Sequence, residues 1–220
     1  MTKIYPVIHY KNDETTLQEA HIAKNAGADG VFLISHIGHN ERLIPLGVQI
    51  KQSLNMDVGL NFLGDDAIYT ADIVKYNGLD MVWSDSCGVS SKGLDSEGIE
   101  LMEWANNNKN ITVFASVAFK YQGVEHNPSL AAQEALKAGF MPTTSGVGTG
   151  YAPSVEKIKL MSESVNGVLA VASGMTCDNV DQFSTYLSHI LVATGVSKDE
   201  YHFDEDKLSL FIKTVKKNDL

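Results

Sequence analysis

The chain has 220 residues, of which 44% are hydrophobic and 20% are charged, and its formal net charge is −10. A chain of this length and composition can bury one sizeable core, so we expect a single domain over residues 1–220. The acidic balance repels polyanions and argues against binding to nucleic acid or to an anionic membrane, although backbone amides can still hold a small anion locally.

The cysteine content indicates the redox setting. Cys87 and Cys177 lie far apart, without a CxxC motif or a Cys/His cluster. This spacing signals neither a disulfide framework nor a zinc site, and we expect both to be reduced thiols. The N-terminal residues lack the pattern of a secretory signal, and no run of eighteen apolar residues occurs. The sequence therefore predicts a soluble, unprocessed cytoplasmic protein.

Short apolar runs rich in β-branched residues alternate with longer stretches of helical periodicity, which is typical of repeated βαβ units. The expected strands are residues 4–10, 30–35, 58–63, 79–85, 112–118, 140–145, 168–173 and 190–194. The expected helices are residues 15–28, 40–54, 66–77, 96–107, 127–139, a segment beginning at 154, 176–186 and 204–216.

Eight strand–helix units in a right-handed series either close into a barrel or open into a doubly wound sheet. No linker rich in proline, serine or glycine divides the chain, and its composition does not shift along its length. Closure is therefore favoured. The expected fold class is α/β, a single-domain (β/α)8 TIM barrel.

Three loops after the sixth, seventh and eighth strands are rich in glycine and hydroxyl groups. They read TTSGVGTG from residue 143, ASGMT from residue 172 and ATGVS from residue 193. In a parallel barrel, loops at the carboxyl ends of the strands form the active site. Turn chemistry explains glycine in any one loop, but three adjacent loops predict a phosphate site built from backbone amides. Its residues are expected to be Gly146, Gly148, Thr149, Gly150, Ser173, Gly174, Thr194 and Gly195.

These motifs carry a family resemblance. The segments SGVGTG (145–150), ASGMTCDNV (172–180) and TGVS (194–197) resemble the closing third of the BtpA family. The opening is similar as well, with Ile8-His9 ending the first strand and AGADG at 26–30. The sequence departs from the family pattern at residues 10–14, where YKNDE replaces a proline-rich stretch.

The resemblance implies a phosphate-binding barrel more than a particular activity. Other barrels, such as phosphoribosylanthranilate isomerase and tryptophan synthase α, share the glycine loops. BtpA family members are associated with photosystem assembly and with sugar or nucleoside gene contexts.

Catalytic groups are expected opposite the phosphate site. Asp85 ends the fourth strand, where its carboxylate would act as general base, general acid or oxocarbenium stabiliser. The alternative is a turn aspartate bonded to the amides of Cys87 or Gly88. His9 ends the first strand and is either a proton shuttle or a histidine hydrogen-bonded beneath the first loop.

Further polar residues are candidates for substrate contacts. His36 and His39 follow the second strand, but two histidines without a further clear ligand are weak evidence for a metal, so we expect polar contacts and no metal. Asn61 lies in an apolar strand and needs a partner, either a ligand or a neighbouring strand. Lys120 follows the fifth strand and either contacts an anion, acts as a Schiff-base amine if it is desolvated, or points into solvent. Cys87 is expected to be an inert thiol rather than a nucleophile.

The sequence therefore predicts an enzyme acting on a small phosphorylated metabolite, such as a phosphoribosyl compound or a nucleotide. Asp85 and His9 would perform glycosidic cleavage, isomerisation or lyase chemistry. Neither a Rossmann fingerprint nor a P-loop is present, so no cofactor is expected. The alternative is a noncatalytic ligand-binding or assembly protein that retains the phosphate site. A homo-oligomer is compatible with either function.

Overall fold

The computed structural model describes residues 1–218, and its eight parallel strands form a closed barrel. The barrel strands are β1 (Lys3–His9), β2 (Gly30–Ile34), β3 (Asp57–Asn61), β4 (Met81–Ser84), β7 (Thr112–Ser116), β8 (Met141–Thr144), β9 (Ala170–Ala172) and β10 (His189–Val192). Each strand pairs with the next along the chain, and β10 closes the barrel against β1. The predicted (β/α)8 barrel is thus confirmed.

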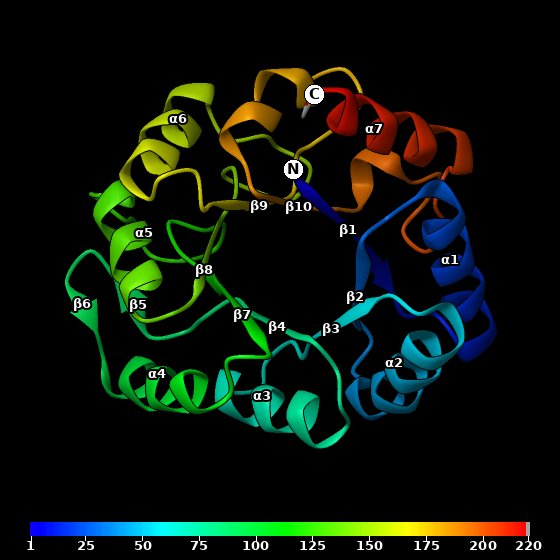
Figure 1. Cartoon of the computed structure of the whole chain (residues 1–220), viewed down its shortest axis with the longest axis horizontal. Coiled ribbons are helices and arrows are strands. Elements are labelled where there is room, and N and C mark those ends of the chain that lie inside the picture. Colours follow the sequence, from blue (N-terminus) through cyan, green and yellow to red (C-terminus); the bar gives the residue numbers. More distant parts are fainter. Residues whose placement is uncertain (219–220) are drawn as a thin grey trace.

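The helices form a ring around the strands, which Figure 1 shows in a view through the barrel. They are α1 (Asp13–Ala26), α2 (Asn40–Leu54), α3 (Ala67–Tyr76), α4 (Ser96–Asn107), α5 (Pro128–Lys137), α6 (Val155–Ser164) and α7 (Glu205–Asn218). Within the described residues, no helix combines the length and the apolar character needed to cross a membrane.

Local sequence signals explain where several helices begin and end. Asn12 caps α1 by accepting a hydrogen bond from the Thr15 amide, and Gly27 ends the helix at φ 90°. Ser154 caps α6 in the same way by accepting from the Lys157 amide. The predicted ends of α1, residues 15 and 28, nevertheless lie two residues beyond the observed ends at residues 13 and 26.

The prediction of a helix over residues 176–186 is wrong. This segment instead contains two short 3-10 turns, η1 (Val180–Gln182) and η2 (Ser184–Tyr186). Val180 and Phe183 are both buried, and their spacing of three residues suits the 3.0-residue repeat of a 3-10 turn. Burial of these side chains therefore outweighed the longer helical pattern.

A small hairpin was not predicted. The strands β5 (Val89–Ser90) and β6 (Gly93–Leu94) pair antiparallel between β4 and α4. Each strand has only two residues, too few for an alternating pattern to be recognised in the sequence. The hairpin enlarges the loop that follows Asp85.

The strands carry two separate apolar layers, because successive side chains point to opposite faces. On β1, Ile4 and Ile8 belong to the core between strands and helices, whereas Tyr5 and Val7 belong to the core inside the barrel. The interior core also contains Phe32, Ile34, Met81, Trp83, Phe114, Phe119, Ala170, Ala172 and Leu191. Side chains therefore fill the barrel, which leaves room for a ligand only at its ends.

Three aromatic rings occupy the centre of this interior core. The ring centroids of Phe32 and Phe114 lie 5.2 Å apart, and Tyr5 meets both rings edge to face at 5.9 Å. Gly59 leaves the space that the Phe32 ring occupies, since a Cβ at Gly59 would lie 2.2 Å from Phe32 Cε1. The two residues, which are paired on the neighbouring strands β2 and β3, are therefore complementary in size.

His189 lies at the amino ends of the strands, and we expect it to make the stability of the protein depend on pH. Burial, and secondarily the charge of Lys3, lower the pKa of His189 to about 4, from an ordinary value of 6.5. His189 therefore binds a proton more readily in the unfolded chain than in the folded protein. The contribution of His189 to the free energy of unfolding is complete above pH 6.5 and is lost as the pH falls towards 4. This loss amounts to at most about 3 kcal/mol.

Urea unfolding between pH 7 and pH 4 measures this effect. His189→Gln is expected to flatten the pH dependence of the unfolding free energy, although His9 keeps its own contribution because its pKa is also lowered to about 4. The exposed His21 on α1 provides the control variant His21→Gln, which is expected to keep the full slope. An unchanged slope in His189→Gln would exclude His189 as a source of acid sensitivity.

Candidate functional site

The alternation of inward-facing and outward-facing side chains continues to the residues at the carboxyl ends of the strands. His9 follows Val7 on the inner face of β1, and by the same two-residue step Asn61 follows Gly59. Asp85 follows Trp83, whose ring lies inside the barrel. The alternation therefore brings three of the predicted residues, from three different strands, to one mouth.

A cavity of about 80 Å³ occupies this mouth. It is lined by Val7, His9, Ile34, His36, Trp83, Lys120, Thr149, Ala172, Ser173, Leu191, Ala193 and Thr194. Six of these residues are candidates from the sequence, namely His9, His36, Lys120, Thr149, Ser173 and Thr194. The structure therefore gathers groups that are up to 185 positions apart in the chain, from His9 to Thr194.

Asp85 lies beside this cavity with Asn61 and Lys120. Desolvation in the mouth raises the pKa of the Asp85 carboxyl, although the residue remains accessible to water, and Lys120 and Asn61 oppose this rise. The turn after β4 is instead bridged by Ser84, whose Oγ accepts from the Ser86 amide at 3.3 Å. Within residues 1–218, no amide of Cys87 or Gly88 donates to the Asp85 carboxylate, whose polar neighbours are instead the side chains of Asn61 and Lys120.

Asn61 is 1% exposed, and its Nδ2 atom has no hydrogen-bond partner within the described part of the chain. A buried polar group without a partner costs free energy, so such groups need an explanation. Asn61 therefore does not tie two strands together through Nδ2. Its free N–H groups lie close enough to Asp85 to lower the pKa of that carboxyl.

Lys120 crosses the mouth from the loop after β7. Its Nζ donates to Thr149 Oγ1 at 3.1 Å, and its backbone amide donates to Ser145 Oγ at 2.8 Å. Burial lowers the pKa of Lys120, while Asp85 and Tyr121 raise it. Lys120 is the one lysine or arginine among the cavity-lining residues that the structure describes. Its ammonium group therefore makes one side of the cavity electropositive.

The predicted glycines allow the three loops to pack closely together. A Cβ at Gly174 would lie 2.3 Å from the Ala152 nitrogen, one at Gly195 would lie 1.9 Å from the Met175 oxygen, and one at Gly146 would meet the Tyr151 oxygen at 2.1 Å. These glycines are thus required for backbone packing, whether or not a ligand binds.

The same loops nevertheless present free donors near the cavity. The backbone N–H groups of Gly174, Thr194 and Gly195 donate to no acceptor in residues 1–218. Ser173 and Thr194 line the cavity beside them, and Ser173 has a φ of 89°, a strained value for a residue with a side chain. Backbone amides without a protein acceptor, next to hydroxyl groups, are an arrangement that proteins use to bind anions.

The remaining predicted glycines lie farther from the cavity. The Gly150 amide donates to Ser173 Oγ at 3.0 Å, and the Gly148 carbonyl accepts from the Tyr151 amide at 3.2 Å. Gly146 instead lines a neighbouring hollow of about 490 Å³ between the loops after β7 and β8. These three residues shape the loop that presents Thr149.

His9 and His36 lie together at the opposite rim, with ring centroids 4.7 Å apart. Burial, aided by the charge of His36, lowers the pKa of His9 to about 4. His9 is therefore a neutral imidazole at pH 7, and its Nδ1 atom is buried without a partner among the described residues. A neutral imidazole offers one nitrogen that accepts a hydrogen bond or binds a metal.

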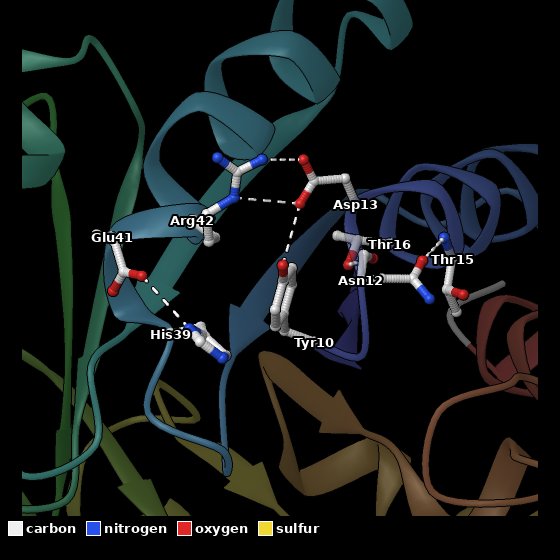
Figure 2. Close-up of polar contacts among 8 residues, drawn as sticks. All are labelled: Tyr10, Asn12, Asp13, Thr15, Thr16, His39, Glu41 and Arg42. Carbon is white, nitrogen blue, oxygen red and sulfur yellow. Dashed lines mark hydrogen bonds and ion pairs between the residues drawn. The ribbon is translucent and has the colours of Figure 1, made fainter.

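His39 does not join this group. Its ring packs edge to face on Tyr10 at 5.9 Å, and its Nδ1 lies 3.4 Å from Glu41. Figure 2 shows His39 beside a polar cluster in which Asp13 contacts both Tyr10 and Arg42. This cluster joins the first turns of α1 and α2, so His39 lies at the periphery of the mouth.

Two further residues show what the sequence predicted and what it missed. Burial raises the pKa of Cys87 to about 12, which makes it an unreactive thiol at neutral pH. Lys157 was not predicted, yet its Nζ donates to the carbonyls of Ala118 at 2.7 Å and Ser145 at 2.8 Å. Lys157 therefore joins the loop after β7, which carries Lys120, to the loop after β8. A lysine in the first turn of a helix is unfavourable because it lies at the positive end of the helix dipole. Its position at the start of α6 is the sequence feature that would have indicated a specific role for Lys157.

Comparisons with solved structures show barrels of the same architecture. Phosphoribosylanthranilate isomerase from Thermus thermophilus superposes with a TM-score of 0.68 at 13% identity, over 99% of this chain and 100% of that one. A geranylgeranylglyceryl phosphate synthase from Thermoplasma acidophilum, in complex with sn-glycerol-1-phosphate, gives 0.68 at 12% identity over 98% and 94%. At these identities the likeness establishes the fold.

Sequence comparison identifies the family. The uncharacterized protein MJ1115 of Methanocaldococcus jannaschii is 27% identical over 163 residues, which cover 68% of this chain and 60% of that protein. The chain therefore aligns with less than two thirds of that relative's length. The model of the BtpA family matches residues 42–217. The chain belongs to the BtpA family.

Proposed function

We propose that this protein is an enzyme that acts on a small phosphorylated metabolite bound in the barrel mouth. The observation that carries the proposal is a group of hydrogen-bond donors in and beside one cavity. Lys120 and Thr194 line the cavity. Gly174 and Gly195 adjoin the lining residues Ser173 and Thr194, and the amides of Gly174, Thr194 and Gly195 have no protein acceptor in residues 1–218. Amides and an ammonium group arranged around a small cavity suit a phosphate group.

Asp85 performs proton transfer in this proposal. The carboxylate lies at the mouth beside Lys120 and Asn61, and its raised pKa brings it closer to neutrality, where a general acid or base is most effective. The phosphate would fix the substrate in position, so that a single carboxylate acts on a defined bond. His9 would contact the substrate as a neutral imidazole. A phosphoribosyl compound or nucleotide is the substrate class that we propose, and the reaction is a glycosidic cleavage, isomerisation or lyase step.

The similar solved structures support the phosphate part of the proposal. One of them is an isomerase named for a phosphoribosyl substrate, and another is a synthase bound to sn-glycerol-1-phosphate. A noncatalytic ligand-binding or assembly protein is the second candidate, because the cavity alone binds a phosphate without requiring Asp85 to react. The two candidates differ in whether Asp85 is needed beyond binding.

Thermal unfolding in the presence of phosphate tests the ligand. A ligand that binds only the folded state stabilises it by mass action. For a Kd of about 1 mM, 10 mM inorganic phosphate or ribose 5-phosphate stabilises the protein by about 1.4 kcal/mol. That is expected to raise Tm by about 3–5 °C. Lys120→Met is expected to remove most of this shift because it deletes the cation of the cavity.

Lys159→Met provides the matched control for this experiment. Lys159 is exposed on α6, outside the set of cavity-lining residues, and the variant is expected to retain the full ligand-induced shift. Equal shifts in Lys120→Met and Lys159→Met would place phosphate elsewhere on the molecule. Absence of any shift at millimolar concentrations, for every phosphorylated compound tried, would refute the phosphate site.

A further inference from the structure

We propose that His9, His36 and Glu200 form a binding site for a divalent transition metal at the rim of the cavity. Each of these residues offers one ligand atom, and the three atoms lie within 4.8 Å of one another. They come from the end of β1, from the loop after β2 and from the loop after η3 (Thr194–Val196). Two histidines alone were insufficient to predict a metal, and the fold supplies the carboxylate that the local sequence lacks.

The spacing of the ligand atoms suits a metal with short bonds. His36 Nδ1 lies 3.4 Å from Glu200 Oε1. In a tetrahedral site with bonds of about 2.0–2.1 Å, neighbouring ligand atoms are about 3.3 Å apart. One edge of the coordination tetrahedron is therefore already formed. The ligand atom of His9 lies within 4.8 Å of the other two, so metal binding requires it to move closer by side-chain rotation.

One of the two ring nitrogens of His9 lacks a hydrogen-bond partner in the described structure. Its Nδ1 atom is buried and has no hydrogen-bond partner in residues 1–218. Its ring lies against that of His36, with centroids 4.7 Å apart. A buried nitrogen without a partner is unfavourable unless a ligand satisfies the imidazole. His9 thus serves in this proposal as a metal ligand rather than as the proton shuttle expected from the sequence.

The loop that carries Glu200 is fastened at both ends. Ser197 and Phe203 form an antiparallel bridge, and the Lys198 amide donates to the His202 carbonyl at 2.8 Å. Within the loop, the Asp199 carboxylate accepts from the amides of Tyr201 and His202, at 2.8 and 3.0 Å. Glu200 is therefore held at the tip of an ordered turn rather than on a loose surface loop.

A buried carboxylate anchors this loop to the body of the barrel. Phe203 is 4% exposed, and its amide donates to Glu19 Oε2 at 2.6 Å. Glu19 is itself 2% exposed and belongs to α1, the helix that follows His9. The loop after η3 is thus attached to the element next to β1, and this contact keeps Glu200 close to the two histidines.

The chemistry of the donors selects the class of metal. Two imidazoles and one carboxylate suit Zn²⁺ and related divalent transition metals, whereas Mg²⁺ and Ca²⁺ prefer ligands that are all oxygen. Three protein ligands leave one position open. His9 and His36 both line the cavity, so the open position faces it. If the proposed function is correct, an oxygen of the phosphorylated ligand or a water molecule occupies that position.

Metal binding is tested on the chelator-treated full chain with Zn²⁺, and with Co²⁺ as a spectroscopic probe. Titration calorimetry and native mass spectrometry are expected to show one Zn²⁺ per chain, and Co²⁺ to give the visible absorption of a tetrahedral site. Glu200→Gln and His36→Ala are each expected to weaken Zn²⁺ at least about a hundredfold. Loss of an outer-shell partner alone costs about 10–100-fold, and these residues are direct ligands.

His39→Ala is the matched control, because His39 is a neighbouring exposed histidine that pairs with Glu41 and lies outside the cluster. It is expected to bind Zn²⁺ as the wild type does. Glu200 and His36 are half exposed, so their variants are expected to keep the wild-type circular dichroism. Absence of stoichiometric Zn²⁺ binding, or binding unchanged in both Glu200→Gln and His36→Ala, would overturn the proposal.

The phosphate-induced shift in Tm of the metal-free protein separates this inference from the proposed function. A phosphate shift in a protein that binds no Zn²⁺ would refute the metal site and leave the phosphate site intact. Stoichiometric Zn²⁺ binding that depends on His36 and Glu200, without any phosphate shift, would support the metal site and refute the phosphorylated ligand.

Discussion

Asp85→Asn is expected to lower kcat by about 10²–10⁴-fold, the usual contribution of a positioned general acid or base. The substrate for this assay is the phosphorylated compound that the wild-type protein retains from a metabolite extract and turns over. Asparagine keeps the size of the side chain but neither gives up nor accepts a proton at neutral pH. Binding of the ligand, measured as the shift in Tm, is expected to persist because Lys120 and the loop amides remain.

The control for this variant is Asp178→Asn, which removes an exposed carboxylate from the turn after β9. Its kcat is expected to match that of the wild type. Full activity of Asp85→Asn would show that Asp85 is not the proton-transfer group. Ligand binding without turnover of any retained compound by the wild type would favour the noncatalytic candidate.

Phe114→Ala is expected to destabilise the protein by about 3–5 kcal/mol, the usual cost of truncating a buried phenylalanine. The Phe114 ring is completely buried and meets three other rings inside the barrel, those of Tyr5, Phe32 and His189, at 5.9, 5.2 and 5.4 Å. Surrounding strands are hydrogen-bonded into a closed barrel, so they cannot collapse into the cavity that alanine leaves. Urea unfolding monitored by circular dichroism measures the loss.

Leu210→Ala offers a comparison on the surface. Leu210 is 55% exposed on α7, and its truncation is expected to change the unfolding free energy by less than about 0.5 kcal/mol. A loss below about 1 kcal/mol in Phe114→Ala would mean that the interior core repacks easily, contrary to the close aromatic contacts observed.

Part of the candidate site was readable from the sequence, because its residues end regular strands. His9 and Asn61 are the last inward-facing residues of β1 and β3, and Asp85 continues the same alternation one residue beyond β4. Parallel strands place all their carboxyl ends at one mouth, so predicting the strands also predicted the location of these side chains. Predicting the glycine loops after β8, β9 and β10 followed the same logic.

Loop residues were harder to place, since their positions depend on contacts distant in sequence. His36 and His39 have equivalent surroundings in the sequence, yet only His36 lines the cavity. Glu200 reaches His36 across 164 positions because Phe203 and Glu19 fasten its loop. No local pattern around Glu200 signals that contact.

Hydrophobic periodicity and the glycine motifs are local properties of the chain, so the barrel and the family could both be predicted from the sequence. The 3-10 turns in residues 176–186, the hairpin of β5 and β6, and the grouping of His9 with His36 and Glu200 became apparent only in the folded structure. In each of these, packing against distant elements outweighs local propensity. A short segment has too few internal hydrogen bonds to fix its own conformation.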